Sequence, residues 1–318
     1  MPFDALRSAI SSAGSSAVSS AVSSVASSSP EAAGSSAPVA IFDSGLGGLS
    51  VLRAVRAALP DERLIYVADS LYAPYGERDD DFIADRTLAI GEWLVSQGAK
   101  TLVVACNTAT SQSIAETRER LPIPVIGVEP GIKPAALTSQ TRVVGVLATA
   151  VTLRSARFQA LAERHTSDCH FILQPGHGLV QAVERCDTNS PELVALLRSY
   201  VQPMLDANAD TLVLGCTHYP FLDEAIRSIS GDRLKLVDTS VAIARQLERQ
   251  LDSFGLRAAP AQAQAHNQAQ AVELPRFYST NDGRALRQLA ASLLGLDVTV
   301  EHIVIPSRRT LALESDPV

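Results

Sequence analysis

The sequence predicts an α/β fold made of two similar, doubly wound parallel-sheet domains. Short and almost continuous apolar stretches alternate with helix-like stretches along most of the chain, as in "RLIYVADS" and "TLVVACNT". Strands that are buried on both faces of a parallel sheet have this composition, and the intervening helices supply the crossovers. The alternation comes in two successive series, and each series has a cysteine after a late strand, at Cys106 and at Cys216.

The first series begins at Pro38, where "PVAIFDSGLGG" predicts a strand that ends at Asp43-Ser44 and continues into a glycine loop. The stretch "LSVLRAVRAAL" then has the apolar spacing of a helix. The pattern recurs in "RLIYVADS" before "LYAPYGER", in "TLVVACNT" before a helix that contains "SIAETRER", and in "PVIGVEP" before "GIKPAAL". Each repeat is a strand, a polar tip and a helix, which is the βα unit of an α/β fold.

The second series begins with "RVVGVLATAVTLRS" and continues through "FILQPGHGLVQAVER", "TLVLGCTHYPFLDEAIRSI" and "LKLVDTS", with a helix at "VAIARQLERQL". A similar number of residues separates Ser44 from Cys106 and Thr149 from Cys216. This agreement hints at an internal duplication. The final stretches "RFYSTNDGRALRQLAASLLG" and "VTVEHIVI" predict a strand, a helix and a strand that complete one domain.

These boundaries give an expected domain organisation. Residues 1–36 form a Ser/Ala-rich tail that cannot build a core and lacks the continuous apolar segment of a signal peptide. Residues 37–133 together with 239–305 form the first α/β domain, and residues 134–238 form the second. A Gln/Ala-rich stretch at 255–275 resembles an insertion or linker, and 306–318 is a C-terminal tail.

Composition excludes several classes of function. The net charge is −7, and no Lys/Arg block is present that could neutralise a row of phosphates, so we expect no nucleic-acid partner. No apolar run reaches the roughly 18 residues of a membrane span. The four cysteines form no C-x-x-C pair and have no metal-like spacing with the six histidines, which indicates no metal site and reduced thiols in a cytoplasm.

Polar residues stand at the ends of the predicted strands, where ligands of open α/β sheets bind. A cysteine in this position also lies near the start of the following helix, whose free N–H groups stabilise a thiolate. Cys106 and Cys216 are therefore candidate bases, although a single cysteine after apolar residues is more often a small buried hydrophobe. His218 could relay a proton for Cys216 or be structural, and Asp43 could serve Cys106 or only cap a helix.

Two loops allow two interpretations each. The glycines of "DSGLGG" could hold a phosphate or simply permit a tight turn, but the loop lacks the Lys-Ser/Thr of a P-loop and is not G-x-G-x-x-G. The segment "PYGER" could be an ordinary turn, or Tyr75 and the backbone at Gly76 could contact a small ligand.

Taken together, the strings "FDSGLGGLSVL", "YVADSLYAPYGER", "VVACNTATS", "VIGVEPGIKPA", "GVLATAVTLRS", "LVLGCTHYPFL" and "VDTS" resemble the glutamate racemase family, within the aspartate/glutamate racemases, in sequence and in order. The resemblance covers about residues 38–305. It implies a cofactor-independent amino-acid racemase that interconverts L- and D-glutamate in the cleft between two pseudo-symmetric domains, and that supplies D-glutamate for peptidoglycan in a bacterial cytoplasm.

The resemblance also implies roles for individual residues. Cys216 would act on L-glutamate and Cys106 on D-glutamate, from opposite faces of the α-carbon. Asp43 would assist Cys106, His218 would assist Cys216, and Glu184 would be a further acidic helper, in a stretch where the local match is loose. The implied substrate contacts are Asp43, Ser44, Tyr75, Gly76, Asn107, Thr108, Thr149, Thr217 and His218.

Two alternatives to a glutamate racemase stay open at this stage: a related enzyme such as an aspartate racemase, and a non-catalytic ligand-binding sensor on the same scaffold. A sensor would require neither of the two bases. Some members of the family need a cell-wall precursor as activator, so such a precursor is a candidate partner besides the substrate, and a homodimer is a candidate assembly.

Overall fold

Two parallel sheets organise the chain, and both belong to one compact unit. The computed structural model describes residues 34–165, 169–260 and 274–306. The two predicted tails and the predicted insertion at 255–275 lie largely outside these residues.

The first sheet has six strands in the order β10-β9-β2-β1-β3-β4, and every neighbouring pair is parallel. Its strands are β1 (Val39–Asp43), β2 (Leu64–Ala68), β3 (Thr101–Val104), β4 (Val125–Gly127), β9 (Arg276–Ser279) and β10 (Val300–His302). Because β9 pairs with β2, the C-terminal segment contributes β9 and β10 to this sheet.

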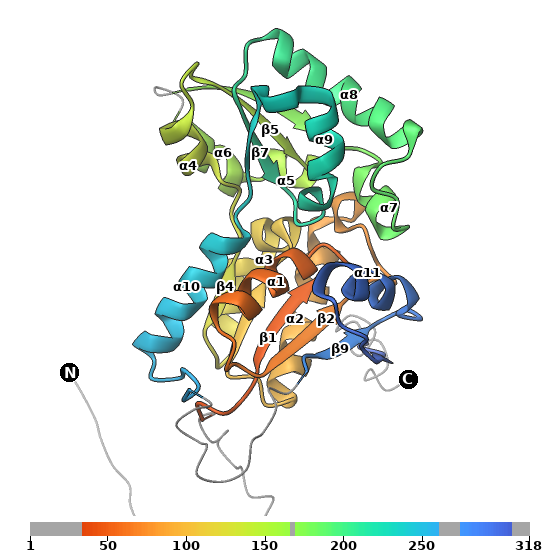
Figure 1. Ribbon diagram of the computed structural model, residues 1–318. Helices are drawn as coiled ribbons and strands as arrows, with labels where there is room; N and C mark the ends of the chain where they lie inside the picture. The colour runs from red at the N-terminus through yellow and green to blue at the C-terminus, as the bar shows by residue number, and fades with distance from the viewer. Residues whose placement is uncertain (1–33, 166–168, 261–273, 307–318) are drawn as a thin grey trace, which may run out of the picture. The chain divides into compact units, whose positions relative to one another are not determined.

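Helices cover both faces of the first sheet (Figure 1). Alternate residues of β1 explain why: Val39 and Ile41 pack on one face, whereas Ala40 and Phe42 pack on the other. The first face is covered by α1 (Leu49–Ala58), α10 (Ser240–Ser253) and α11 (Arg284–Leu294), and the second by α2 (Asp80–Ser96) and α3 (Asn107–Arg120).

The second sheet has four parallel strands in the order β6-β5-β7-β8. They are β5 (Val143–Ala148), β6 (His170–Pro175), β7 (Thr211–Gly215) and β8 (Lys235–Val237). One face packs against α7 (Leu179–Glu184), α8 (Pro191–Asp206) and α9 (Asp223–Ser230). The other packs against α4 (Ile132–Thr138) and α6 (Ala156–Glu163), with α5 (Ala150–Arg154) directly after β5.

The two sheets repeat one strand order. In each sheet the first strand of its series lies between the second and the third, as β2-β1-β3-β4 and as β6-β5-β7-β8. The predicted fold class, two parallel α/β sheets with helices on both faces, is confirmed. The predicted domain ranges stay a prediction: the boundary at 133/134 lies inside α4, and the boundary at 238/239 lies between β8 and α10.

Several helices begin with a side chain that accepts from a free backbone N–H. Asp79 caps α2, Ser155 caps α6, and Ser190 caps α8 ahead of a proline at the first helical position. Cys106 caps α3 and Thr149 caps α5 in the same way. Local helix chemistry therefore fixes two of the predicted site residues directly at strand ends.

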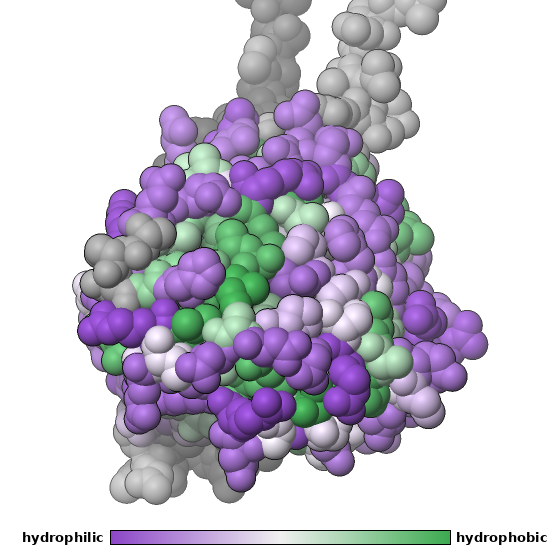
Figure 2. All heavy atoms as spheres, turned by 90° about the horizontal axis from the view of Figure 1, so that it is seen from above, coloured by the Kyte–Doolittle hydropathy of each residue, from purple (hydrophilic) through white to green (hydrophobic). Residues whose placement is uncertain are grey.

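The surface is mostly polar, and Figure 2 shows an area of apolar side chains within it on the face that it presents. Isolated apolar side chains at a surface are normal. Within the described ranges, the large apolar residues that are exposed are Leu71, Leu137, Leu173, Val241, Phe254, Leu274 and Val304. Among the helices of the described residues, none has the length and apolar character to span a membrane.

A buried ion pair fastens the segment after β2 to the first sheet. Arg86 of α2 contacts both carboxylate oxygens of Asp69, at 3.0 Å from Nε and 2.8 Å from Nη2, and both side chains are almost completely buried. The same guanidinium donates to the carbonyl of Ile305 and lies 4.5 Å from the ring centre of Tyr72. The Tyr75 hydroxyl donates to Asp69 at 2.5 Å. Arg86 thus anchors the segment that carries Tyr75 and Gly76.

We predict that Arg86→Met lowers the free energy of unfolding by about 3–5 kcal/mol, because it leaves the Asp69 carboxylate buried without its counter-ion. Denaturant unfolding of the wild type and the variant measures the difference. Arg120→Met is the matched control, since it removes an exposed pair with Glu116 and should cost no more than about 0.5 kcal/mol. Equal losses in the two variants would contradict the anchoring role.

Candidate active site

The loop after β1 is the centre of the candidate site. Gly45 N and Gly48 N donate to Asp43 Oδ2 at 3.2 and 3.1 Å, and Leu46 N donates to Glu184 Oε1 at 2.7 Å. The loop has no room for side chains at its glycines: a Cβ on Gly45 would lie 2.0 Å from Glu184 Oε1, and one on Gly47 would lie 2.4 Å from His218 Nδ1. The glycines therefore allow the loop to approach Glu184 at the end of α7 and His218 after β7, a role that differs from both a phosphate loop and a simple turn.

Cys106 lies at the end of β3, beside the end of β1. Its Sγ is 3.4 Å from Ser44 Oγ and accepts from Ala109 N at 3.4 Å, at the start of α3. The residue is 5% exposed. Burial is the main cause that raises the pKa of Cys106 to about 12; the negative charge of Asp43 adds to it, and the bonds from Ser44 and Ala109 oppose it. Cys106 is therefore held as a neutral thiol at neutral pH.

Cys216 lies at the corresponding place in the second sheet, directly after β7, and has a different partner. Its Sγ is 3.7 Å from His218 Nδ1, and His218 Nε2 is 2.6 Å from Glu184 Oε1. Burial by itself lowers the pKa of His218, but the hydrogen bonds to Cys216 and Glu184 outweigh it and raise that pKa well above its usual value. Cys216, His218 and Glu184 thus form one series of contacts, with the histidine ring between the sulfur and the carboxylate.

Asp43 and Thr217 join the two half-sites. Thr217 Oγ1 donates to Asp43 Oδ1 at 3.2 Å, so the residue beside Cys216 contacts the residue beside Ser44. Asp43 is fully buried, and this burial raises its pKa, which His218 partly offsets. The carboxylate hydrogen-bonds Gly45, Gly48 and Thr217, and its effect on Cys106 is electrostatic.

Three threonine hydroxyls meet where α3 and α5 begin. Thr108 Oγ1 is 2.9 Å from Thr149 Oγ1, and Thr152 Oγ1 lies 3.0 Å from Thr149 Oγ1 and 3.5 Å from Thr108 Oγ1. Beside Thr108, Asn107 is 5% exposed, and its Nδ2 has no hydrogen-bond partner among the described residues. A buried amide donor without a partner is costly unless a ligand accepts from it.

Tyr75 and Gly76 occupy different surroundings, on the short helix η1 (Tyr75–Glu77). Tyr75 is fully buried with its hydroxyl on Asp69, so the phenol is already occupied. Gly76 packs against Thr149, where an added Cβ would lie 3.1 Å from the threonine Cβ. A small hollow of about 30 Å³ adjoins Gly76, Thr149 and the 176–181 segment.

The structure brings most predicted site residues into one contact network. It links Asp43, Ser44, Cys106, Glu184, Cys216, Thr217 and His218 through the bonds described above, and Thr108 and Thr149 form a second group. Their roles in chemistry or binding stay predictions. Thr152 and Tyr66 are not among the predicted site residues; the hydroxyl of Tyr66 donates to Gly45 O at 2.8 Å. The fourth position of "TAVT" could have indicated Thr152, whereas Tyr66 stands inside an ordinary apolar strand.

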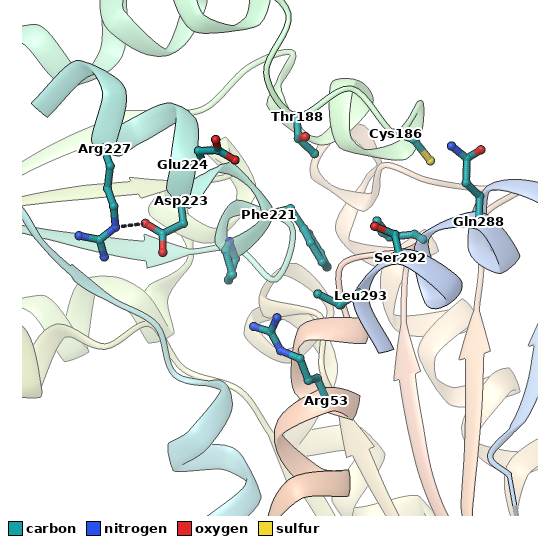
Figure 3. A pocket seen from close by; sticks show the side chains of 12 residues that line it. Arg53, Cys186, Thr188, Phe221, Asp223, Glu224, Arg227, Gln288, Ser292 and Leu293 are labelled. Atoms are coloured by element: carbon teal, nitrogen blue, oxygen red, sulfur yellow. Dashed lines mark ion pairs between the residues drawn. The ribbon is translucent and has the colours of Figure 1, made fainter. Parts of the chain in front are cut away.

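A larger pocket of about 560 Å³ lies apart from this network, and none of the predicted site residues lines it. Figure 3 shows Arg53 of α1 and Leu293 of α11 on the side opposite Phe221, with Arg227 paired to Asp223. Within the described residues, no group of three or more His, Cys, Asp or Glu side chains is arranged to hold a metal ion.

Comparison with known proteins identifies the family of the chain. The profile of the family described as Asp/Glu/Hydantoin racemase matches residues 49–247. Glutamate racemase of Ralstonia pickettii (strain 12J) is 59% identical over 261 residues, which are 82% of this chain and 89% of that protein. Glutamate racemase of Ralstonia nicotianae is 58% identical over the same length, which covers 91% of that protein.

The solved structures that are similar to this chain include glutamate racemases. Escherichia coli glutamate racemase, in complex with L-glutamate and the activator UDP-MurNAc-ala, matches with a TM-score of 0.73 and 31% identity, over 85% of this chain and 99% of that one. Glutamate racemase of Francisella tularensis, in complex with D-glutamate, matches with a TM-score of 0.72 and 26% identity, over 86% and 99%. The chain therefore belongs to the Asp/Glu/hydantoin racemase family, and within it to the glutamate racemases.

Proposed function

We propose that this protein interconverts L- and D-glutamate without a cofactor, by two proton transfers at the α-carbon. The observation that carries the proposal is the matched position of two buried cysteines at the ends of β3 and β7, joined through the loop 44–48 and surrounded by opposite charges. One thiol removes the α-proton, and the other delivers a proton to the opposite face.

The charges around the two thiols suit a division of labour. Cys106 is a neutral thiol beside Asp43, and Cys216 is beside a positive His218. In this protonation state Cys216 is the base and Cys106 the acid, which is the state that receives L-glutamate. The reverse state, with the proton on Cys216, receives D-glutamate. Asp43 supports Cys106, while His218 and Glu184 support Cys216.

Stabilisation of the carbanion must come from the site, because the α-proton of an amino acid is far less acidic than a thiol. Fixed N–H and hydroxyl donors in a site closed to water are the available means. Asn107 Nδ2 needs an acceptor, and the hydroxyls of Ser44, Thr108 and Thr149 can donate to the two substrate carboxylates. The backbone of Gly76 completes the binding side, with Tyr75 holding that segment in place, and Asp43 faces the ammonium group.

The proposal extends to the wider role of the reaction. We propose that the D-glutamate is used for peptidoglycan synthesis and that the protein acts in a bacterial cytoplasm, where its thiols stay reduced. We also propose that a cell-wall precursor activates the protein and that the protein forms a homodimer. The complex of the Escherichia coli enzyme with its activator supports the first of these.

Replacing either thiol tests the function. We expect Cys106→Ser and Cys216→Ser each to lower kcat/KM for glutamate by about 10²–10⁴-fold, because an alcohol is a poor base at neutral pH. Loss of circular dichroism from L-glutamate measures the rate. Cys169→Ser, at a buried cysteine outside the site, should racemise normally. With L-aspartate the wild type should be at least about tenfold slower. A wild-type rate in either catalytic variant would exclude the two-thiol reaction, and preference for aspartate would change the substrate.

The pH dependence should be bell-shaped, since the reaction needs one thiolate and one thiol. On the basic side of the profile, activity falls as His218 loses its proton. Glu184 helps to raise the pKa of His218. Glu184→Gln removes that negative charge, so the pKa of His218 falls and the basic limb of kcat/KM moves to lower pH, by about one unit or more.

The pH dependence of kcat/KM, measured from both enantiomers, checks this prediction. The two enantiomers have equal free energy, so kcat/KM must be equal in the two directions at every pH, which controls the quality of the rates. Glu192→Gln, at an exposed glutamate in the first turn of α8, is the control and should leave the profile unchanged. An unmoved basic limb in Glu184→Gln would show that Glu184 does not set the charge of His218.

A further inference from the structure

Tyr66 lies beneath the candidate site, in the middle of β2, and no role in the proposed reaction has been given to it. The side chain is fully buried, and its ring packs against Phe277 at 5.9 Å between ring centres. Its hydroxyl lies at the edge of this apolar core and donates to Gly45 O at 2.8 Å. A Cβ on Gly48 would lie 2.9 Å from the hydroxyl and 2.7 Å from Asp43 Cβ, so the hydroxyl is in the layer directly below the loop.

The acceptor of this hydrogen bond is part of a longer chain of bonds. Gly45 O and Leu46 N belong to one planar peptide unit, and its trans geometry points the carbonyl and the N–H in opposite directions. On the far side, Leu46 N donates to Glu184 Oε1 at 2.7 Å. The same oxygen is 2.6 Å from His218 Nε2, and His218 Nδ1 is 3.7 Å from Cys216 Sγ.

We propose that Tyr66 is a positioning residue for the reaction: by fixing the Gly45–Leu46 peptide it holds Glu184, and through Glu184 the His218–Cys216 pair, in the geometry of proton transfer. The inference rests on the proposed racemase function. Hydrogen bonds in such a series polarise one another, and a peptide with its carbonyl bound is a better N–H donor. The phenol stays protonated, since burial raises its pKa well above the usual value and the negative charges of Asp43 and Glu184 add to this.

The glycines on either side of Leu46 show what Tyr66 adds to the loop. Gly45 and Gly47 cannot carry side chains without striking Glu184 or His218, so the loop is held by the buried Leu46 side chain and by the bonds from Gly45 N and Gly48 N to Asp43. None of these contacts involves Gly45 O, and a rotation of the Gly45–Leu46 peptide would turn the Leu46 N–H away from Glu184. Tyr66 opposes that rotation from the rigid core of the first sheet.

The experiment is a double-mutant cycle between Tyr66→Phe and Glu184→Gln, measured as glutamate racemisation. Tyr66→Phe should lower kcat about tenfold and leave KM within about twofold. The hydroxyl affects the geometry of proton transfer and contacts none of the groups proposed to bind the substrate. In the Glu184→Gln background the same substitution should change kcat by less than about twofold, because its path is already broken. Tyr200→Phe also removes a hydroxyl from a backbone carbonyl, that of His177 at 3.0 Å, and should leave kcat unchanged in both backgrounds.

A purely structural tyrosine would behave differently. Tyr66→Phe would then lower the midpoint of denaturant unfolding with kcat unchanged, or its loss of kcat would multiply with that of Glu184→Gln; either result overturns the inference. Replacement of Tyr66 by p-aminophenylalanine restores an N–H donor and should recover most of kcat. If Tyr66→Phe does not fold, the cycle is carried out with p-aminophenylalanine at position 66. Its weaker donor should lower kcat slightly when Glu184 is present and should have no effect in the Glu184→Gln variant. A wild type that does not racemise glutamate would instead refute the proposed function.

Discussion

Parallel pairing controls where the chemistry of this chain can occur. In the first sheet β1 pairs with β3, and in the second β5 pairs with β7, so that Ser44 lies beside Cys106 and Thr149 beside Cys216 at the carboxyl ends of the strands. Helix α3 begins directly after Cys106 and helix α5 directly after Thr149, and their first turns supply free N–H groups that a ligand or a sulfur needs. Two copies of one strand order thus give two thiols in equivalent local positions.

Equivalent positions do not give equivalent chemistry, because the neighbours of the two thiols differ. Burial, together with the neighbouring Asp43 carboxylate, raises the pKa of Cys106, whereas Cys216 is next to His218, whose pKa is raised by its hydrogen bonds to Cys216 and Glu184. The loop 44–48 connects these surroundings, and its glycines allow the two half-sites to approach within hydrogen-bonding distance. A buried charge lowers the stability of the fold unless its hydrogen-bond and ion-pair partners are all present. The same holds for the buried Arg86–Asp69 pair.

Much of this arrangement could be predicted from the sequence, since strands buried on both faces and polar strand ends follow from local composition. The positions of Cys106, Cys216 and His218 could be predicted for that reason. The partners of the loop could not, because Leu46 N reaches Glu184 only after both sheets have formed, and a local pattern contains no record of such a contact. Tyr66 was missed for a related reason: in the strand "LIYVA" nothing separates a tyrosine with a functional hydroxyl from one that only fills the core. Tyr75 stays a predicted substrate contact; that its hydroxyl donates to Asp69, which Arg86 also binds, could not be read from the local pattern "PYGER".

The central claim is that two different thiols act on the two faces of one carbon, and deuterium incorporation tests it most directly. Racemisation is started in D₂O from L-glutamate and, separately, from D-glutamate, and deuterium at the α-carbon is measured by NMR in substrate and product during the first few per cent of conversion. The two-thiol account predicts deuterium in the newly formed enantiomer and almost none in the remaining substrate, from either starting enantiomer. Equal deuterium in the substrate and the product from the beginning would mean that one base, or solvent, exchanges the proton on both faces, and would contradict the account.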